Sequence, residues 1–203
     1  RLFADAGLAV VPHRLCHTAS AAVEAAAKLG YPVALKIASP DIVHKSDIGG
    51  VALHLNAAEV VREQFAAITE KARLAYPDAH IEGVLVSPMV TGGVEMILGI
   101  QNDPTFGPVV MCGLGGIFVE TLHDIVFRVA PFDVDEAHRM LAELRGVAVL
   151  NGVRGQAPGD IKALATALSS LSRFATAHAG HLDSAELNPV VVLPAGRGVV
   201  ALD

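Results

Sequence analysis

Apolar residues recur along this chain at two spacings, which together predict an α+β fold. Short apolar runs bounded by glycine, proline or polar residues predict strands at residues 8–11, 32–38, 51–55, 81–86, 94–100, 108–112, 125–130, 185–192 and 198–203. Longer segments with apolar residues at helical spacing predict helices at about residues 18–29, 57–76, 133–144 and 158–178. The polar turn at residues 101–107 is expected to join two of the strands into a hairpin.

Side chains that can accept hydrogen bonds from the first turn of a helix precede each predicted helix: Thr18 or Ser20, Asn56, Asp133 or Asp135, and Asp160. Gly30 follows the first of these helices, at the position where a residue with positive φ commonly ends a helix. Asn56 is followed three residues later by Glu59, so Asn56 is expected to open its helix.

One charged residue interrupts an apolar strand, because Lys36 stands between Leu35 and Ile37. A buried lysine needs a fixed anion as its partner. The loop beyond the strand supplies cationic donors, a hydroxyl and glycine N–H groups, from His44, Lys45, Ser46, Gly49 and Gly50. Strand and loop together predict a site that grips the phosphates of a nucleotide; the alternative is a core strand that ends in a solvated turn. The neutral imidazole of His44 is a further candidate, as an acceptor of a phosphoryl group.

Composition narrows the possible functions of the chain. With 203 residues, of which 52% are hydrophobic, it can bury a sizeable core, and its net charge of −6 argues against a nucleic-acid partner. No apolar stretch approaches the roughly 20 residues of a membrane span, so a cytoplasmic location and no membrane partner are expected. Cys16 and Cys112 stand far apart and are expected to be free thiols. The histidines form no zinc-binding motif, and the chain reads as one domain of a longer polypeptide.

Three later segments carry further candidates. Gly115 and Gly116 belong to a glycine cluster that lets the backbone approach a ligand closely, although a tight turn explains the cluster equally well. Arg128 could neutralise a transferring phosphoryl group or form a surface salt bridge. Strand alternation places Glu186 and Asn188 on one face, where a carboxylate and an amide oxygen suit Mg²⁺; the alternative for Glu186 is a polar residue at the start of a strand.

Several of these segments resemble the ATP-grasp domain of NDP-forming acyl-CoA synthetases, which are relatives of the succinyl-CoA synthetase β subunit. The similarity covers essentially the whole chain, and its most specific segments are LKIASPDIVHKSDIGGV from Leu35, VSPMVTGGVEMILGIQNDPTFGPVVMCGLGGIFVE from Val86, LNGVRGQAPGD from Leu150 and AELNPVVV from Ala185. The resemblance implies an ATP-grasp fold with a lid lobe at residues 1–90, a larger lobe at residues 91–203, and the nucleotide bound between the two lobes.

The resemblance also assigns roles to residues. It implies that Ser87 and Met89 lie at the hinge that contacts adenine, although Ser87 stands where relatives of the succinyl-CoA synthetase branch often carry glutamate. Glu95 is placed in the nucleotide pocket, the alternative being a solvent-facing residue. Asn188 and Asp203 are implied as ligands of Mg²⁺, and Glu186 as part of the site that meets a phosphohistidine. The loop at residues 150–160 is provisionally assigned to docking of a partner domain.

The implied reaction converts an acid, CoA and ATP to acyl-CoA, ADP and phosphate by way of an acyl phosphate and a phosphohistidine. The implied cofactors are ATP/ADP and Mg²⁺, and the implied partner is a CoA-binding domain, on the same or another chain, that holds CoA and the acid. A homo-oligomer is also compatible with the sequence. Two other functions remain open: a regulatory nucleotide-sensing module of a fused protein acetyltransferase, and another ATP-grasp carboxylate ligase.

Overall fold

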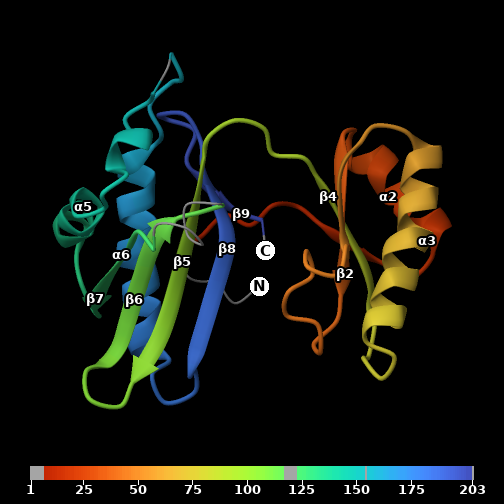
Figure 1. The fold of residues 1–203 in the computed structure, drawn as a ribbon. Helices are drawn as coiled ribbons and strands as arrows, with labels where there is room; N and C mark the ends of the chain where they lie inside the picture. Colours follow the sequence, from red (N-terminus) through yellow and green to blue (C-terminus); the bar gives the residue numbers. More distant parts are fainter. Residues whose placement is uncertain (1–6, 117–122, 154, 203) are drawn as a thin grey trace. The chain divides into compact units, whose positions relative to one another are not determined.

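The computed structural model describes residues 7–116, 123–153 and 155–202. The chain divides into two compact units, one made of Val11–Thr91 and the other of Gly92–Asp203 together with Arg1–Val10. Each unit has its own sheet and its own hydrophobic core (Figure 1). Each is therefore described separately.

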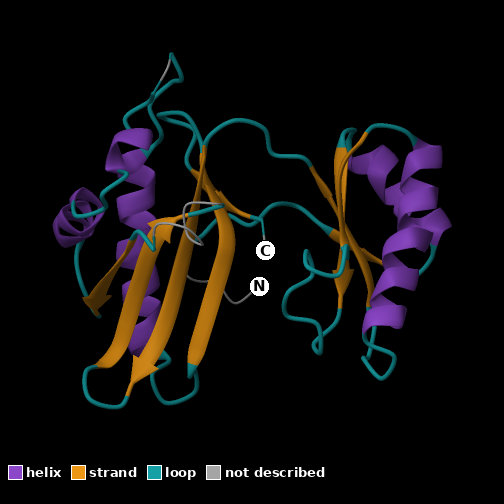
Figure 2. Ribbon diagram, in the orientation of Figure 1, coloured by secondary structure: helices purple, strands orange, loops and turns teal. Residues whose placement is uncertain are grey.

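The unit Val11–Thr91 is a four-stranded antiparallel sheet in the order β1-β4-β2-β3, with two helices on one face (Figure 2). Its elements are β1 (Arg14–Cys16), α2 (Ala19–Leu29), β2 (Val33–Ala38), β3 (Val51–Leu55), α3 (Ala58–Ala75) and β4 (Gly83–Pro88). The Thr18 hydroxyl caps α2 by accepting a hydrogen bond from Ala21 N, and Gly30 ends this helix with φ of 90°. Val33, Leu35 and Ile37 of β2 enter the core beneath the helices.

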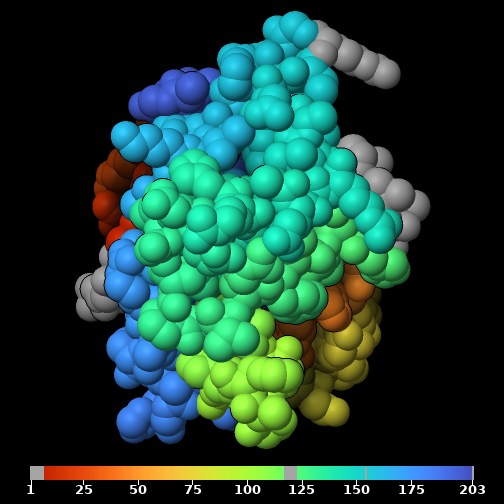
Figure 3. Space-filling model, turned by 90° about the vertical axis from the view of Figure 1, so that its left-hand side faces the viewer, coloured from red at the N-terminus to blue at the C-terminus, as the bar shows by residue number. Residues whose placement is uncertain are grey.

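The second unit is a five-stranded antiparallel sheet in the order β7-β6-β5-β8-β9. Its elements are β5 (Val94–Asp103), β6 (Gly107–Leu114), β7 (Ile125–Val129), α5 (Val134–Ala142), the 3-10 turn η1 (Val147–Val149), α6 (Ile161–Ala177), β8 (Ser184–Val192) and β9 (Val199–Ala201). Asp133 caps α5 and Asp160 caps α6 through their carboxylates, as the sequence predicted. The outer surface that α5 contributes to this unit is seen in Figure 3.

Strand alternation gives this sheet two different faces. Met96, Leu98 and Ile100 of β5 belong to the core cluster that also contains the buried apolar residues of α6. The intervening residues of β5 therefore point to the opposite side of the sheet, away from that core. We call this side the open face, and it includes Glu95 and Gly99.

Several expected elements differ from the structure. Residues 8–11 form no strand, and Val10 makes only an isolated bridge to Ala201. The sequence missed β1, because this short strand is defined by long-range pairing with β4 rather than by an apolar pattern. Asn56 does not open α3: the N-cap is Ala57, which makes no side-chain cap hydrogen bond. The helix expected to reach residue 144 ends at Ala142, and the strand expected at 81–86 is displaced to Gly83–Pro88.

Candidate functional site

Lys36 lies half-buried in β2, on the side of its sheet opposite the helices. The neighbours Leu35 and Ile37 enter the core, so alternation turns Lys36 to the other side. Lys36 pairs with Leu85 of β4, and Ala34 pairs with Ser87. Because Ala34 and Lys36 are two residues apart, Lys36 and Ser87 share one face of this sheet. The structure thus brings together two residues expected to contact the nucleotide.

The loop after β2 is fixed by its own backbone. Gly49 N donates a hydrogen bond to Ser46 O at 3.0 Å, and Gly50 N donates to Lys45 O at 2.8 Å. These N–H groups are therefore engaged within the loop, rather than open to a phosphate as the sequence argument supposed. The structure also requires glycine at both positions for steric reasons, because Gly49 has φ of 66° and a Cβ on Gly50 would lie 2.9 Å from Lys45 O.

The side chains of this loop present a polar surface. His44 and Ser46 are exposed, and Lys45 is half-buried. At the other end of the expected nucleotide site, Met89 N donates to Pro32 O at 2.9 Å, so this N–H already has a partner within its own unit. The roles of these residues in binding a nucleotide stay predictions.

Glu95 and the glycines that follow β6 form one pocket in the second unit. Gly115 N donates to Glu95 O at 2.7 Å. A Cβ on Gly115 would lie 2.9 Å from both the carbonyl carbon and the oxygen of Glu95, so only glycine fits without displacement. The pocket has a volume of about 230 Å³ and is lined by Gly93, Val94, Glu95, Leu114, Gly115, Gly116, Val149 and Gln156. Gln156 was not predicted as a residue of this pocket, because the sequence analysis assigned its glycine-rich loop to docking of a partner domain.

Glu186 and Asn188 lie together on the open face of the sheet. Both are exposed, and Asn188 Nδ2 donates to Glu186 Oε1 at 3.2 Å, which confirms that they share a face. Gly99 pairs with Glu186, and Glu95 pairs with Val191. Because Glu95 and Gly99 are four residues apart on one strand, Glu95 is on this face as well.

This arrangement supplies oxygen donors suited to a hard cation. With Nδ2 committed to Glu186, the amide oxygen of Asn188 remains a potential metal ligand. The other expected ligand, Asp203, lies outside the described residues. Within the described parts of the chain, no group of three or more His, Cys, Asp or Glu residues is arranged to hold a metal ion.

Arg128 is not brought to the open face. It pairs with Val110, a core residue, so its side chain leaves the sheet on the helical side. There Arg128 Nε donates to Glu136 at 2.7 Å, and the guanidinium also bonds Glu143. These two hydrogen bonds, that of Glu143 foremost, raise the pKa of Arg128. The structure thus shows the salt bridge that was the alternative for this residue, and gives its catalytic role no geometric support.

Asp124 is a buried residue whose function the sequence did not reveal. Its carboxylate accepts hydrogen bonds from Arg145 N at 2.9 Å and Gly146 N at 2.8 Å, and so fixes the turn that follows α5. Burial, with a smaller contribution from Asp124, raises the pKa of the Cys112 thiol far above its usual range. Cys16 and Cys112 are free thiols, as expected, and both are buried.

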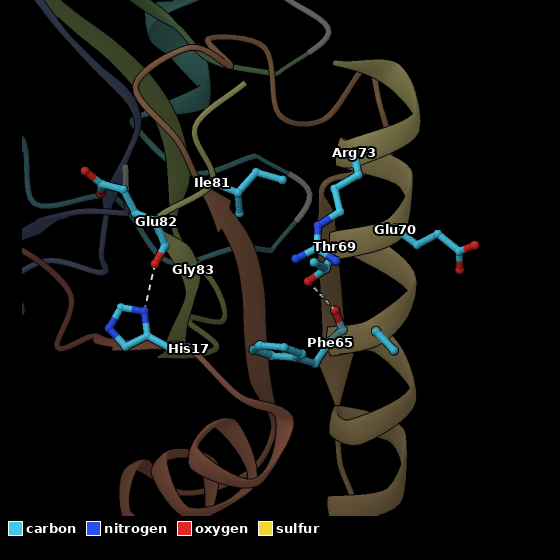
Figure 4. Close-up of a pocket in the computed structure, with 9 residues that line it drawn as sticks. His17, Phe65, Thr69, Glu70, Arg73, Ile81, Glu82 and Gly83 are labelled. Atoms are coloured by element: carbon cyan, nitrogen blue, oxygen red, sulfur yellow. Dashed lines mark hydrogen bonds between the residues drawn. The ribbon is translucent and has the colours of Figure 1, made fainter. Parts of the chain in front are cut away.

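A larger groove lies in the unit Val11–Thr91 and contains none of the predicted site residues. It has a volume of about 650 Å³, and its lining comes from α3 and from the segment that enters β4. Figure 4 shows Phe65 and Ile81 projecting into it, while His17 Nδ1 bonds Glu82 O at 2.8 Å. Glu70 is also part of the lining, although its carboxylate points away from the other labelled residues in this view. We therefore place the candidate site elsewhere.

Among the described residues, no helix combines the length and the apolar character needed to cross a bilayer.

Comparison with known proteins gives a consistent result. The profile of the ATP-grasp domain family matches residues 1–203. The β subunit of ADP-forming acetate–CoA ligase II from Pyrococcus furiosus is 41% identical to this chain, over 97% of the chain and 84% of that subunit. ADP-forming acetate–CoA ligase I from Archaeoglobus fulgidus is 43% identical over 96% of the chain, which spans only 28% of that enzyme.

Solved structures of acetyl-coenzyme A synthetase 1 from Candidatus Korarchaeum cryptofilum share this fold. The complex with coenzyme A, Ca-AMPCP and HgCl⁺ gives a TM-score of 0.94 at 40% identity, covering 99% of this chain and 86% of that one. Another complex, with coenzyme A and Mg-AMPPCP and with its phosphohistidine segment pointing towards the nucleotide binding site, gives 0.79 at 37% identity, covering 99% and 85%. Together with the family match along its length, these similarities show that this chain belongs to the ATP-grasp domain family.

Proposed function

We propose that this chain is the nucleotide-binding, phosphoryl-transferring part of an ADP-forming acyl-CoA synthetase. The observation that carries the proposal is the match along 97% of the chain to a β subunit named as an ADP-forming acetate–CoA ligase. The geometry supports it, because Glu95, Glu186 and Asn188 share the open face of one sheet. In the other unit, Lys36 and Ser87 share a face beside the loop that carries His44 and Lys45.

The amide oxygen of Asn188 on the open face is a donor of the kind that Mg²⁺ prefers. We assign Asn188 Oδ1 and the carboxylate of Asp203 as its ligands, with Glu186 orienting the Asn188 amide through the hydrogen bond from Nδ2. Bound there, Mg²⁺ would neutralise charge on the phosphate oxygens. Lys36 and Lys45 would bind the phosphates, and Glu95 would accept hydrogen bonds from the nucleotide within its pocket.

In the direction of ATP synthesis, the phosphoryl group would pass from a phosphohistidine to ADP. The P–N bond breaks while a P–O bond forms to a terminal oxygen of ADP, and the imidazole nitrogen keeps the electron pair of the broken bond. One proton is taken up by the ring, so the products are ATP and a neutral histidine. The residues of this chain would hold the reactants in line and stabilise their negative charge.

The CoA and acid sites are proposed to lie on a partner domain of the same or another chain. Two comparisons support this: the chain spans only 28% of the Archaeoglobus enzyme, and the Korarchaeum complex contains coenzyme A and a phosphohistidine segment. A cytoplasmic location and a homo-oligomeric state, both compatible with the sequence, are kept as part of the proposal. Which acid is used is a property of the partner domain.

The proposal is tested by measuring acyl-CoA formation from a panel of short-chain and aromatic acids, with ATP, CoA and Mg²⁺. The isolated chain should bind MgATP and form no acyl-CoA, whereas the intact enzyme that contains the CoA-binding domain should form it. Acyl-CoA synthesis by the isolated chain would contradict the proposal that the CoA and acid sites lie on a partner domain. An intact enzyme that binds ATP and yet activates none of the acids would instead favour the nucleotide sensor.

A further inference from the structure

The edge of the five-stranded sheet carries an exposed apolar patch that no step described above uses. It consists of Val109 and Met111 on β6 with Phe127 and Val129 on β7, and we call it the β7 patch. Phe127 is 55% exposed and Val129 is 51% exposed, while Val109 and Met111 are half-buried. The strand register pairs Val109 with Val129 and Met111 with Phe127, so the four side chains form one contiguous cluster.

The β7 patch lies on the same face as the proposed metal ligand. Val126 and Ala130 of the β7 region pack against the core beneath the helices, and Arg128 projects to that same side. Alternation therefore directs Phe127 and Val129 to the open face, where Glu186 and Asn188 lie.

Only one glycine separates the β7 patch from Glu186. Gly99 pairs with Met111 on one side and with Glu186 on the other. Met111 Cε lies 3.0 Å from the position that a Cβ would occupy on Gly99, so the methionine side chain extends over this glycine. The apolar surface thus continues from the edge strand up to the carboxylate of Glu186.

Large apolar side chains on an exposed edge strand favour association with another chain, so they are uncommon on surfaces that contact only water. β7 and β9 are the two edge strands of this sheet. Val10 bridges Ala201 on the outer side of β9, whereas no strand among the described residues pairs with the outer side of β7. A segment that reaches Glu186 across the β7 edge would cover the apolar side chains on its way. Such an exposed patch beside a reaction site indicates an interaction surface for a transient partner.

We propose that the β7 patch is the docking surface for the phosphohistidine-bearing segment of the CoA-binding domain. The inference rests on the proposed function. It is argued from the continuity of the patch with Glu186 and Asn188, and from the Korarchaeum complex in which a phosphohistidine segment points towards the nucleotide binding site. A charged phosphoimidazole cannot itself bury apolar surface, so the residues that flank the histidine must supply the apolar contacts. The segment therefore carries apolar side chains next to its histidine.

The test uses the intact enzyme and a single turnover. The partner histidine is first phosphorylated with phosphate and an acyl-CoA that the wild-type enzyme accepts, chosen from a panel; ADP and Mg²⁺ are then added, and the loss of phosphohistidine is followed by rapid quench. In the double variant Phe127→Thr/Val129→Thr, which places a β-branched residue with high strand propensity at both positions, the loss of phosphohistidine should be about tenfold slower. Formation of phosphohistidine and the affinity for ADP should match the wild type.

Phe106→Thr is the matched control, because Phe106 is 66% exposed in the β5–β6 turn and lies outside the patch. This control should transfer at the wild-type rate. Single Phe127→Thr and Val129→Thr variants provide a second measurement if the double variant loses ADP binding through misfolding. Wild-type transfer rates in ADP-binding patch variants would overturn the docking proposal alone, and a simultaneous loss of self-association would assign the patch to a second copy of the chain. A wild-type enzyme that no acyl-CoA of the panel phosphorylates, or whose phosphohistidine does not react with ADP, would overturn the proposed function itself.

Discussion

Substituting Gly115 by alanine should disturb the pocket around Glu95 through a single added methyl group. The Cβ would lie 2.9 Å from the Glu95 carbonyl carbon and oxygen and 3.0 Å from Glu95 Cβ. Gly115 does not have a positive φ, so alanine is compatible with its backbone conformation and the contact alone causes the strain. Either the loop or the end of β5 must shift, and the hydrogen bond from Gly115 N to Glu95 O must lengthen. Overpacking of this kind costs about 1–3 kcal/mol.

That strain should appear as weaker nucleotide binding. If most of it is released by moving Glu95, the affinity for ADP should fall by about tenfold, which corresponds to about 1.4 kcal/mol. Calorimetric titration with MgADP measures the affinity, and thermal unfolding shows whether the variant remains folded. Gly180→Ala is the control, because nothing lies within 4 Å of its added Cβ. A folded Gly115→Ala protein that binds MgADP as tightly as the wild type would refute the assignment of this pocket to the nucleotide.

Four other substitutions address separate parts of the account. Lys36→Ala should weaken ATP binding by about 10-fold to 100-fold, because a charge-assisted contact with phosphate is lost. A folded variant that binds ATP with wild-type affinity in a calorimetric titration would contradict this role of Lys36. His44→Asn tests whether this imidazole accepts a phosphoryl group: label on His44 and reduced turnover in the variant are expected, whereas label only on the partner histidine with normal turnover would make His44 structural. Asn188→Ala should raise the magnesium concentration needed for half-maximal turnover, and an unchanged magnesium dependence would remove Asn188 from the metal site. Asp160→Ala should lower the melting temperature at neutral pH, because hydrogen bonds from Gly198 N–H and then from Ala163 N–H depress the pKa of Asp160 in the folded protein. The resulting stabilisation is fully present above the ordinary pKa near 4 and is lost as the pH falls through the lower pKa of the folded state. Equal melting temperatures of variant and wild type at neutral pH would contradict this prediction.

Features of the fold that depend only on residues close together in the sequence were predictable. Thr18 and Asp160 cap their helices, because capping needs only a short polar side chain at the right position. Strand alternation likewise placed Glu186 and Asn188 on one face, which their hydrogen bond confirms. Asn56 was assigned a cap by the same logic, but the backbone enters α3 one residue later.

Features that depend on long-range pairing could not be predicted in this way. Nothing near β1 indicates that it pairs with β4, and nothing near Asp124 indicates that its carboxylate binds a turn 21 and 22 residues further along the chain. The direction of Arg128 follows from its register with Val110, which is fixed by the core beneath α6. The same register pairs Phe127 with Met111, which in turn pairs with Gly99 beside Glu186. The sequence therefore indicated which residue types could serve the site. Which of these residues share a face of a sheet followed only from the pairing of the strands.

An isotope experiment follows the proposed transfer of a phosphoryl group to ADP step by step. The intact enzyme is incubated with radiolabelled phosphate, an acyl-CoA, ADP and Mg²⁺, and the label in protein histidine, ATP and free phosphate is followed with time. Label should appear first on histidine and then in the γ-phosphate of ATP, with one CoA released per ATP formed, and Asn188→Ala should slow the second step. An enzyme that binds MgADP but moves no label into ATP with any of a panel of acyl-CoA substrates would contradict the proposed transfer.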